Sequence, residues 1–353
     1  MKIIFYFLTL IILVSSCSKT EDYLPTNFNY EIKPVEITED VDLGAYYYNY
    51  SDIDWAKNYT NTPVLGEYNS LDQGVMEQQQ VWAKEGGIDF FIFNWNGTQE
   101  DEELLNSFKS WGSNDVKMVV NYNTAHLGLS NESPLIDGKL TLMLDEFKDM
   151  ALHYFSQDFY YRTNGRPVVL FSPINLSASR SESIDFNVVI PALREAMNEI
   201  GIDLYILGEI TSGWLPPQRY SEAIQTLDAI SLKDWSTNNY DRSVFFPSYV
   251  DQNWQNWTDS TTVWGVDFTP VIFSGFDDKA LDPDSPLYNL GGNPQFYVDL
   301  CHVAKRNMSE SRMVLINSWN NFQFGNTIEP TEEYGTGYLE ITKDQFKVHS
   351  LKH

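Results

Sequence analysis

The chain has 353 residues, 42% of them hydrophobic and 15% aromatic, which is the composition of a packed globular protein. Its formal net charge of −26 argues against nucleic acids and anionic membrane surfaces as partners, because a strongly negative protein repels phosphate groups. A neutral ligand fits this charge better, and the 10 Trp and 21 Tyr provide the flat rings that stack on sugars.

The first residues predict a secretory signal peptide that spans residues 1–16. An apolar run from Ile3 to Val14 follows a lysine, is too short to cross a bilayer, and is bounded by small residues. The order Val-Ser-Ser-Cys, which ends at Cys17, resembles the lipobox of bacterial lipoproteins. We therefore expect Cys17 to be the lipidated first residue of the mature protein, and the polar residues 17–40 to form a tether.

This N-terminus also predicts where the protein resides. A lipidated Cys17 would hold it in the bacterial outer membrane, and the acidic pair Glu21-Asp22 resembles signals for exposure at the cell surface. The membrane would then be a partner only through the lipid anchor. The other cysteine, Cys301, has no disulfide partner, and we expect it to be a core residue of a helix.

Strand-like and helix-like segments alternate from residue 41 onward. Helical patterns cover residues 72–85, 140–155, 188–200, 221–227 and 295–306, and Gly86-Gly87 ends the first of them. Eight apolar runs predict strands, which begin near Leu43, Ile88, Val116, Pro167, Leu204, Ala229, Pro270 and Met313. Because strands separated by helices pair in parallel, residues 41–353 predict an α/β fold, a closed (β/α)8 TIM barrel.

The active sites of such barrels lie at the carboxyl ends of the strands, and here most predicted strands end in an amide, an aromatic ring or a carboxylate. Amides and acids bond to hydroxyl groups, and flat rings stack on the apolar face of a sugar. Asparagine after a strand is also a common turn former, so each one alone is ambiguous. Together they predict a carbohydrate site with the candidate binding residues Tyr48, Trp95, Asn96 and Tyr122.

The region after the sixth predicted strand, residues 234–267, is rich in aromatic residues. Val250, Trp254 and Trp257 recur at helical spacing and predict a helix that packs on the barrel. Trp235 comes earlier, directly after the strand, and we expect it to contact a ligand.

Two long segments resemble glycoside hydrolase family 99 and its WbsX-like relatives. They are TPVLGEYNSLDQGVMEQQQVWAKEGGIDFFIFNWNG (residues 62–97) and VLINSWNNFQFGNTIEPTEEYGTGYLE (residues 314–340). The resemblance runs from about Leu43 to Glu340, with its blocks in the same order. It implies a barrel, a glycan substrate and, by analogy with family 99, cleavage of alpha-mannosidic linkages within chains.

The family carries its two catalytic glutamates in the pattern Trp-Asn-Glu-Trp-His-Glu-Gly, and here that pattern departs from the family. Trp319 and Asn320 match, whereas Asn321 and Phe324 stand at the two glutamate positions and Gln323 at the histidine. An amide cannot accept a proton at working pH, and a phenylalanine can neither donate nor accept one. Trp319, Asn320, Asn321 and Gln323 therefore remain candidates for substrate binding only.

If the chain is a hydrolase, its acids lie elsewhere, and Glu209 is the first candidate. It ends an apolar run, DLYILGE, which would partly desolvate its carboxylate as a general acid requires, although a hydrogen-bonded structural glutamate is an equal alternative. Asp234 and Asp278 are the next candidates, but Asp278 fits turn capping better. Glu67, which matches the family, could bind a hydroxyl group or anchor its loop. Glu329 is also retained, outside the acid pair.

The sequence has no Gly-rich phosphate loop, no His-Glu metal-binding helix and no nucleophile elbow, so we expect neither a cofactor nor a metal. The leading hypothesis is a divergent glycosidase of the cell envelope that acts on an oligosaccharide or polysaccharide, as in polysaccharide utilisation. The alternative is a non-catalytic glycan-binding lipoprotein. Two carboxylates facing each other across the cleft would favour the enzyme, whereas amides and rings alone would favour the binding protein.

Overall fold

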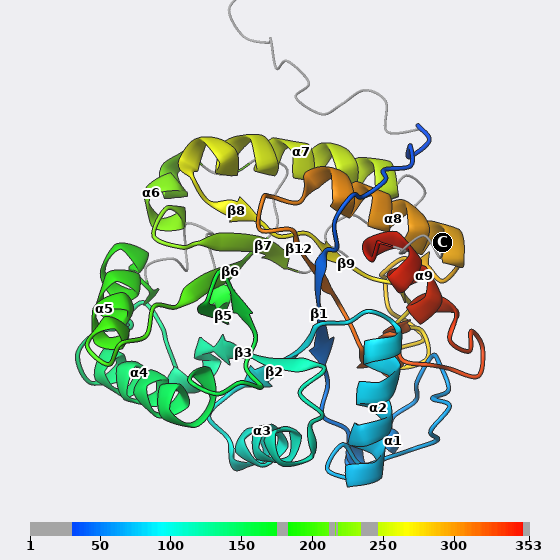
Figure 1. Ribbon diagram of the computed structural model, residues 1–353, viewed down its shortest axis with the longest axis horizontal. Coiled ribbons are helices and arrows are strands. Elements are labelled where there is room, and N and C mark those ends of the chain that lie inside the picture. The colour runs from blue at the N-terminus through cyan, green and yellow to red at the C-terminus, as the bar shows by residue number, and fades with distance from the viewer. Residues whose placement is uncertain (1–29, 175–182, 212–215, 217, 234–245, 349–353) are drawn as a thin grey trace, which may run out of the picture.

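The structure, a computed structural model, describes residues 30–174, 183–211, 216, 218–233 and 246–348. Nine strands of this part pair in parallel in the order β8-β7-β6-β5-β3-β2-β1-β12-β9, and helices surround them (Figure 1). These strands are β1 (Asp42–Tyr47), β2 (Phe90–Trp95), β3 (Lys117–Asn123), β5 (Arg166–Ile174), β6 (Tyr205–Thr211), β7 (Ala229–Lys233), β8 (Asp267–Phe268), β9 (Val271–Ile272) and β12 (Met313–Ile316).

The ring closes through β8 and β9, two short consecutive strands that together occupy one of the strand positions of the barrel. Pro270 lacks a backbone N–H and interrupts the ladder between them. On one side the Thr269 N–H donates to the Ile230 carbonyl at 2.8 Å, and on the other the Leu315 N–H donates to the Pro270 carbonyl at 2.9 Å. The path therefore joins β7 to β12 and gives eight barrel positions, which confirms the eight predicted strands and the TIM-barrel fold.

Each barrel strand is followed by at least one helix. The helices are α1 (Asp52–Trp55), α2 (Gln73–Glu85), α3 (Gln99–Trp111), α4 (Asp137–Met150), α5 (Phe186–Asn198), α6 (Ser221–Ile224), α7 (Phe246–Trp264), α8 (Pro294–Asn307) and α9 (Gly337–Phe346). The predicted helices correspond to α2, α4, α5, α6, α7 and α8. Short pairs complete the structure: β4 (Arg162–Thr163) extends β5, β10 (Gly275–Phe276) pairs with β11 (Leu290–Gly291), and β13 (Asn320–Asn321) pairs with β14 (Asn326–Thr327).

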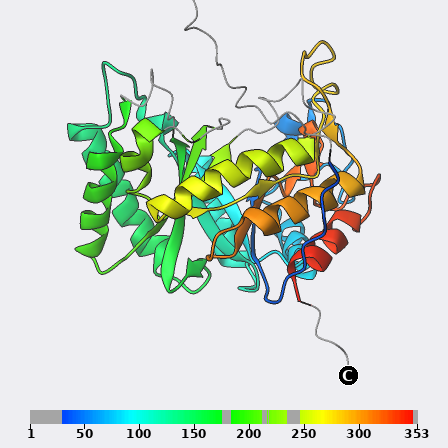
Figure 2. The same ribbon diagram turned by 90° about the horizontal axis from the view of Figure 1, so that it is seen from above.

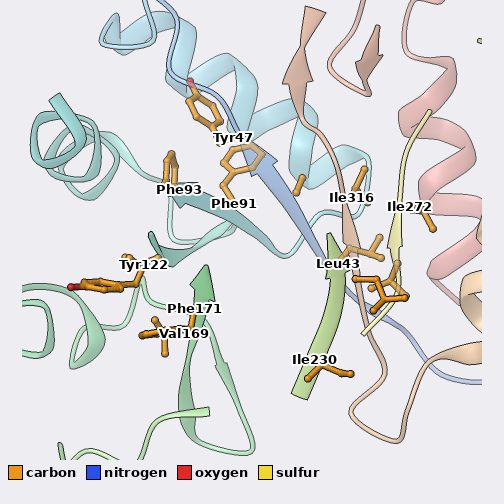
Figure 3. Packing of buried hydrophobic residues seen from close by; sticks show 14 of the residues in the cluster. Leu43, Tyr47, Phe91, Phe93, Tyr122, Val169, Phe171, Ile230, Ile272 and Ile316 are labelled. Carbon is orange, nitrogen blue, oxygen red and sulfur yellow. The ribbon is translucent and has the colours of Figure 1, made fainter. Parts of the chain in front are cut away.

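Alternate side chains of the strands form two separate cores. One set points outward against the helices, and Figure 3 shows Tyr47, Phe91 and Phe93 of β1 and β2 in this layer. The other set fills the barrel and includes Phe90, Ile92 and their neighbours on the other strands. This period of two decides which residues at the strand ends face the barrel axis.

Two predicted helix assignments are confirmed. Val250, Trp254 and Trp257 are buried on α7, so the aromatic segment packs as a helix. Cys301 is a buried free thiol in α8. In the described part of the chain, no helix is long and apolar enough to cross a membrane.

The N-terminal segment from Tyr30 lies against α7 and α8, along the outside of the barrel (Figure 2). The Tyr30 hydroxyl donates to Asp251 at 2.9 Å, Arg306 donates to the Lys33 carbonyl at 3.1 Å, and Ile32 is buried. The last part of the predicted tether is thus packed on the domain. The predicted signal peptide and Cys17 lie outside the described residues.

Gly44 is a point where the barrel interior tolerates no side chain. A Cβ at this position of β1 would lie 2.1 Å from the ring of Phe90, which is fully buried and stacks on Tyr161. We expect Gly44→Ala to lower the free energy of unfolding by about 1–3 kcal/mol, measured by urea denaturation. Gly138→Ala, in the first turn of α4 with open space around it, is the matched control and should change stability little. Equal losses of unfolding free energy in Gly44→Ala and Gly138→Ala would show that the lack of space beside Phe90 is not what makes Gly44 necessary.

Candidate active site

A cavity of about 120 Å³ opens among the carboxyl ends of the barrel strands. The side chains that line it come from β1, β2, β3, β6, β7 and β9, and from the loops after β9 and β12. Its polar lining residues are Tyr46, Tyr48, Asn94, Asn121, Glu209, Ser231, Asn317 and Asn326, and Phe273 and Phe276 form part of its apolar wall.

The two-residue period of the strands places these polar groups in the barrel. Along β2, Phe90 and Ile92 fill the interior and Asn94 is the next residue on the same face. Along β6, Leu207 fills the interior and Glu209 follows. The apolar layers below therefore support one polar layer at the carboxyl end.

Glu209 lies in this polar layer and is 4% exposed. The hydroxyl of Tyr46 donates a hydrogen bond to its Oε1. The Asn121 amide donates to its Oε2 at 3.4 Å, and to Asn94 Oδ1 at 2.9 Å. The first predicted candidate acid thus borders the cavity with a phenol and an amide beside it.

Three buried polar atoms of the lining have no hydrogen-bond partner within the described residues. They are Asn121 Oδ1, Ser231 Oγ and Asn326 Oδ1. Leaving such a group unpaired costs about 1–3 kcal/mol, so a ligand that supplies hydroxyl donors would be stabilised here. The described lining contains no lysine or arginine. This cavity therefore suits a neutral ligand with many hydroxyl groups.

Asn320 fixes one wall of the cavity from behind. Its side chain accepts from the Tyr48 N–H at 2.7 Å and donates to the Tyr48 carbonyl at 2.9 Å, and it is fully buried. It also donates to the Tyr68 hydroxyl at 3.0 Å. Asn320 was predicted to bind substrate, and the structure places it one layer behind Tyr48, which does line the cavity.

Glu329 ends this buried network. Its Oε2 accepts from the Tyr68 hydroxyl at 2.9 Å and from Gln79 Nε2 at 3.0 Å, and the residue is 1% exposed. Burial raises the pKa of Glu329 to about 8, because the two hydrogen bonds compensate only part of the lost hydration. This carboxyl group therefore keeps its proton at neutral pH and holds Tyr68 and Gln79 in place.

Asn321 and Phe324, which the resemblance to family 99 aligns with its acid pair, do not line the cavity. Phe324 stacks on the lining residue Phe276, with ring centroids 5.9 Å apart and planes at 7°. Asn321 is buried and its backbone N–H donates to Ser318 Oγ at 2.8 Å. Gln323 donates to the carbonyl of Asp54 at 3.1 Å, and Trp319 is fully buried in the helix-facing core.

The candidates Trp95 and Tyr122 face the helices. Their rings stack with centroids 5.3 Å apart, and the Tyr122 hydroxyl donates to Glu146 (Figure 3 shows Tyr122 pointing away from the barrel). Asn96 lies at the rim, where its backbone N–H donates to Asp101 at 2.7 Å.

The remaining candidates are spread around the barrel. Asp278 accepts from the Ser285 hydroxyl in its own loop, and Glu67 is exposed and accepts from Tyr59 at 3.3 Å. Asp234 and Trp235 lie outside the described residues. Of the predicted site residues that the structure describes, Glu209 and Tyr48 are the two brought together at the cavity.

The residues that prediction missed are Tyr46, Asn94, Asn121, Ser231, Asn317 and Asn326. The period of two identifies Asn94 and Asn121 as interior, because each follows interior apolar residues at a spacing of two. Tyr46 likewise lies two residues after the interior Gly44. Asn326 reaches the cavity through a hairpin after β12 and has no comparable signal. No group of acidic, histidine or cysteine residues that could hold a metal ion occurs among the described residues.

The family model described as glycosyltransferase WbsX matches residues 58–342. The chain belongs to the WbsX family. A search of the curated proteins finds no match.

The solved structures place this WbsX protein beside glycoside hydrolases. A "glycoside hydrolase-like protein" superposes with a TM-score of 0.80 at 26% identity, over 91% of this chain and 98% of the other. The GH99 endo-alpha-mannosidase from Bacteroides thetaiotaomicron superposes with a TM-score of 0.62 at 18% identity, over 87% and 97% of the two chains, in its complex with bis-tris propane. The resemblance to the WbsX-like group is confirmed, and the fold is that of a glycoside hydrolase.

Glu329 makes stability depend on pH. The pKa of its carboxyl is near 4.5 in the unfolded chain and about 8 in the folded protein. Its contribution to the free energy of unfolding is therefore complete below about pH 4.5 and is lost as the pH rises through 8. We expect Glu329→Gln to remove this loss. Urea unfolding at about pH 5 and about pH 8 should show the wild type losing several kcal/mol relative to the variant.

Glu332→Gln is the matched control, because Glu332 lies on the same loop and is exposed. It should keep the pH dependence of the wild type. If Glu329→Gln and the wild type lose stability in parallel, Glu329 is ionised in the folded protein and this assignment is wrong.

Proposed function

We propose that this WbsX-family protein is a glycosidase that hydrolyses a neutral glycan in its barrel cavity, with Glu209 taking part in the reaction. The observation that carries the proposal is the position of Glu209. It is a buried carboxylate at the carboxyl end of β6, and hydroxyl and amide groups make up the rest of the described polar lining. Active sites of TIM barrels lie at this end of the strands.

Hydrolysis fits this cavity better than transfer from a nucleotide sugar, although the family's description names a glycosyltransferase. A nucleotide sugar carries phosphates, which proteins bind with lysine, arginine, metal ions or helix N-termini. The described lining holds a carboxylate and no basic side chain, and the whole chain has a net charge of −26. A phosphate in this cavity would be repelled.

A non-catalytic glycan-binding protein is the second candidate. The observation that favours it is that Glu209 is the one carboxylate of the described lining. The resemblance to family 99 also implies glutamates where this chain has Asn321 and Phe324. Most glycosidases need two carboxyl groups across the scissile bond. Asp234 follows β7 directly and is the candidate for a second acid.

We also propose that the protein is a lipoprotein of the outer membrane, anchored through Cys17 and exposed at the cell surface, where it serves polysaccharide utilisation. The apolar run and lipobox-like order of residues 1–17 support this. Cys17→Ser should move the protein from the membrane fraction to the soluble fraction of the cell envelope and abolish incorporation of labelled fatty acid. Unchanged membrane association and labelling would contradict the anchor.

The test of the function is Glu209→Gln, assayed with a panel of bacterial, yeast and plant glycans for both released sugar and binding. We expect release by the wild type, a loss of at least about a hundredfold in the variant, and retained binding, because Gln preserves shape but cannot exchange a proton.

Glu146→Gln is the matched control. Glu146 also accepts a hydrogen bond from a tyrosine, Tyr122, but lies outside the cavity. Full release by this control separates loss of chemistry from loss of folding. Saturable binding without release by the wild type would support the binding protein, and full turnover by Glu209→Gln would remove Glu209 from the mechanism.

A further inference from the structure

We propose that Tyr46 is the nucleophile of this site and that Glu209 is its general base. This inference rests on the proposed function, because it requires a sugar in the cavity. The sequence has no glutamate at either position of the acid pattern that the resemblance implies, and the structure places a phenol directly beside the cavity carboxylate. A tyrosine nucleophile is an established solution in sialidases.

The position of Tyr46 meets the geometric requirements of a nucleophile. It lies at the end of β1, lines the cavity and is 8% exposed, so its hydroxyl is near the ligand space and largely shielded from bulk water. Its backbone carbonyl accepts from the Trp319 N–H at 2.8 Å, which fixes the strand end. The residue is therefore held in place at the cavity wall.

The contact between Tyr46 and Glu209 provides the activation that a tyrosine needs. A phenol is a weak nucleophile until a base removes its proton, and Glu209 Oε1 already accepts that proton in a hydrogen bond. The Asn121 amide contacts the other carboxylate oxygen at 3.4 Å and so holds Glu209 in orientation. The hydroxyl of Tyr46 thus already points its proton at the carboxylate that would remove it.

Other phenol–carboxylate pairs lie away from the cavity. Tyr205 donates to Asp267 at 2.8 Å at the amino end of the barrel, and Tyr161 donates to Asp42 near the same end. Neither tyrosine lines the cavity. These pairs are structural, and they provide a control with the same chemistry in a different place.

The reaction balances with water alone. Tyr46 Oη attacks the anomeric carbon while its proton passes to Glu209, and the bond from that carbon to the leaving oxygen breaks. The leaving oxygen takes the electron pair and a proton from water, which leaves hydroxide. Hydroxide then attacks the anomeric carbon, Tyr46 leaves as phenolate and recovers its proton from Glu209. The products are two hydroxyl-bearing sugars, and the protein is regenerated.

The alternative is that Glu209 attacks the sugar itself and Tyr46 only orients it. The two mechanisms differ in the residue that carries the sugar, so covalent trapping separates them. The purified protein is first assayed with 2,4-dinitrophenyl glycosides of common hexoses in both anomers. This leaving group departs without a proton, so the assay does not depend on the group that protonates a natural leaving oxygen. The matching 2-deoxy-2-fluoroglycosyl fluoride is then added, and the labelled peptide is identified by mass spectrometry.

We expect the label on Tyr46, no label in Tyr46→Phe, and a fall in turnover of at least about a hundredfold in that variant. Tyr205→Phe loses an equivalent hydrogen bond and should be labelled and active like the wild type. Binding of the glycan by Tyr46→Phe should persist, which shows that the cavity still folds.

Four results would overturn the proposal. A label on Glu209 would make that residue the nucleophile while leaving the proposed glycosidase intact. Turnover by Tyr46→Phe at the wild-type rate would exclude Tyr46 as the nucleophile, and so would an active wild type that is not labelled. Both results would leave the proposed glycosidase function intact. A wild type that neither cleaves nor binds any glycan would remove the proposed function together with this inference.

Discussion

Parallel pairing around a closed ring is the constraint on which the rest of this structure depends. It brings the carboxyl ends of all barrel strands to one rim, and it makes every second side chain of each strand point to the same narrow interior. Space inside is so limited that Phe90 occupies the position next to the backbone of Gly44. Apolar residues fill the lower layers, and the last interior position of several strands is left for Asn94, Asn121, Glu209 and Ser231.

The polar layer is held in place by a second set of residues that a ligand would not touch. Asn320 binds both backbone groups of Tyr48, and Glu329 holds Tyr68 and Gln79 behind it. A protonated carboxyl in that position avoids a buried charge, which would cost several kcal/mol without a cation beside it. Phe324 stacks on Phe276 and extends the apolar wall behind it. The segment after β12 therefore supports the cavity.

Features that depend on residues close together in the sequence could be predicted, whereas features that depend on residues far apart in the sequence could not. Apolar runs and Gly stops are local signals, so the eight strands and six of the helices could be predicted. α3 has no counterpart among the predicted helices, because Leu104, Leu105 and Phe108 are its only buried residues and its first turn is strongly acidic. α9 has no counterpart either. At the site, the predicted binding residues Trp95 and Tyr122 are the sequence neighbours of the lining residues Asn94 and Asn121, so the prediction is wrong by one residue in the alternation. The bonds from Asn320 to Tyr48 and from Glu329 to Gln79 join residues about 250 or more positions apart, and no pattern in a single sequence reveals them.

The unpaired polar atoms of the cavity lining are themselves an argument for a ligand. Asn121 Oδ1, Ser231 Oγ and Asn326 Oδ1 are buried without protein partners in the described structure, and an atom of this kind that is left unpaired costs about 1–3 kcal/mol, so a bound water or ligand group is favoured beside each. A domain whose stability is only about 5–15 kcal/mol bears such groups where binding compensates for them. Hydroxyl groups of a sugar would supply the missing donors, and the Tyr46–Glu209 couple lies within the same small cavity, where a bound anomeric carbon would meet it.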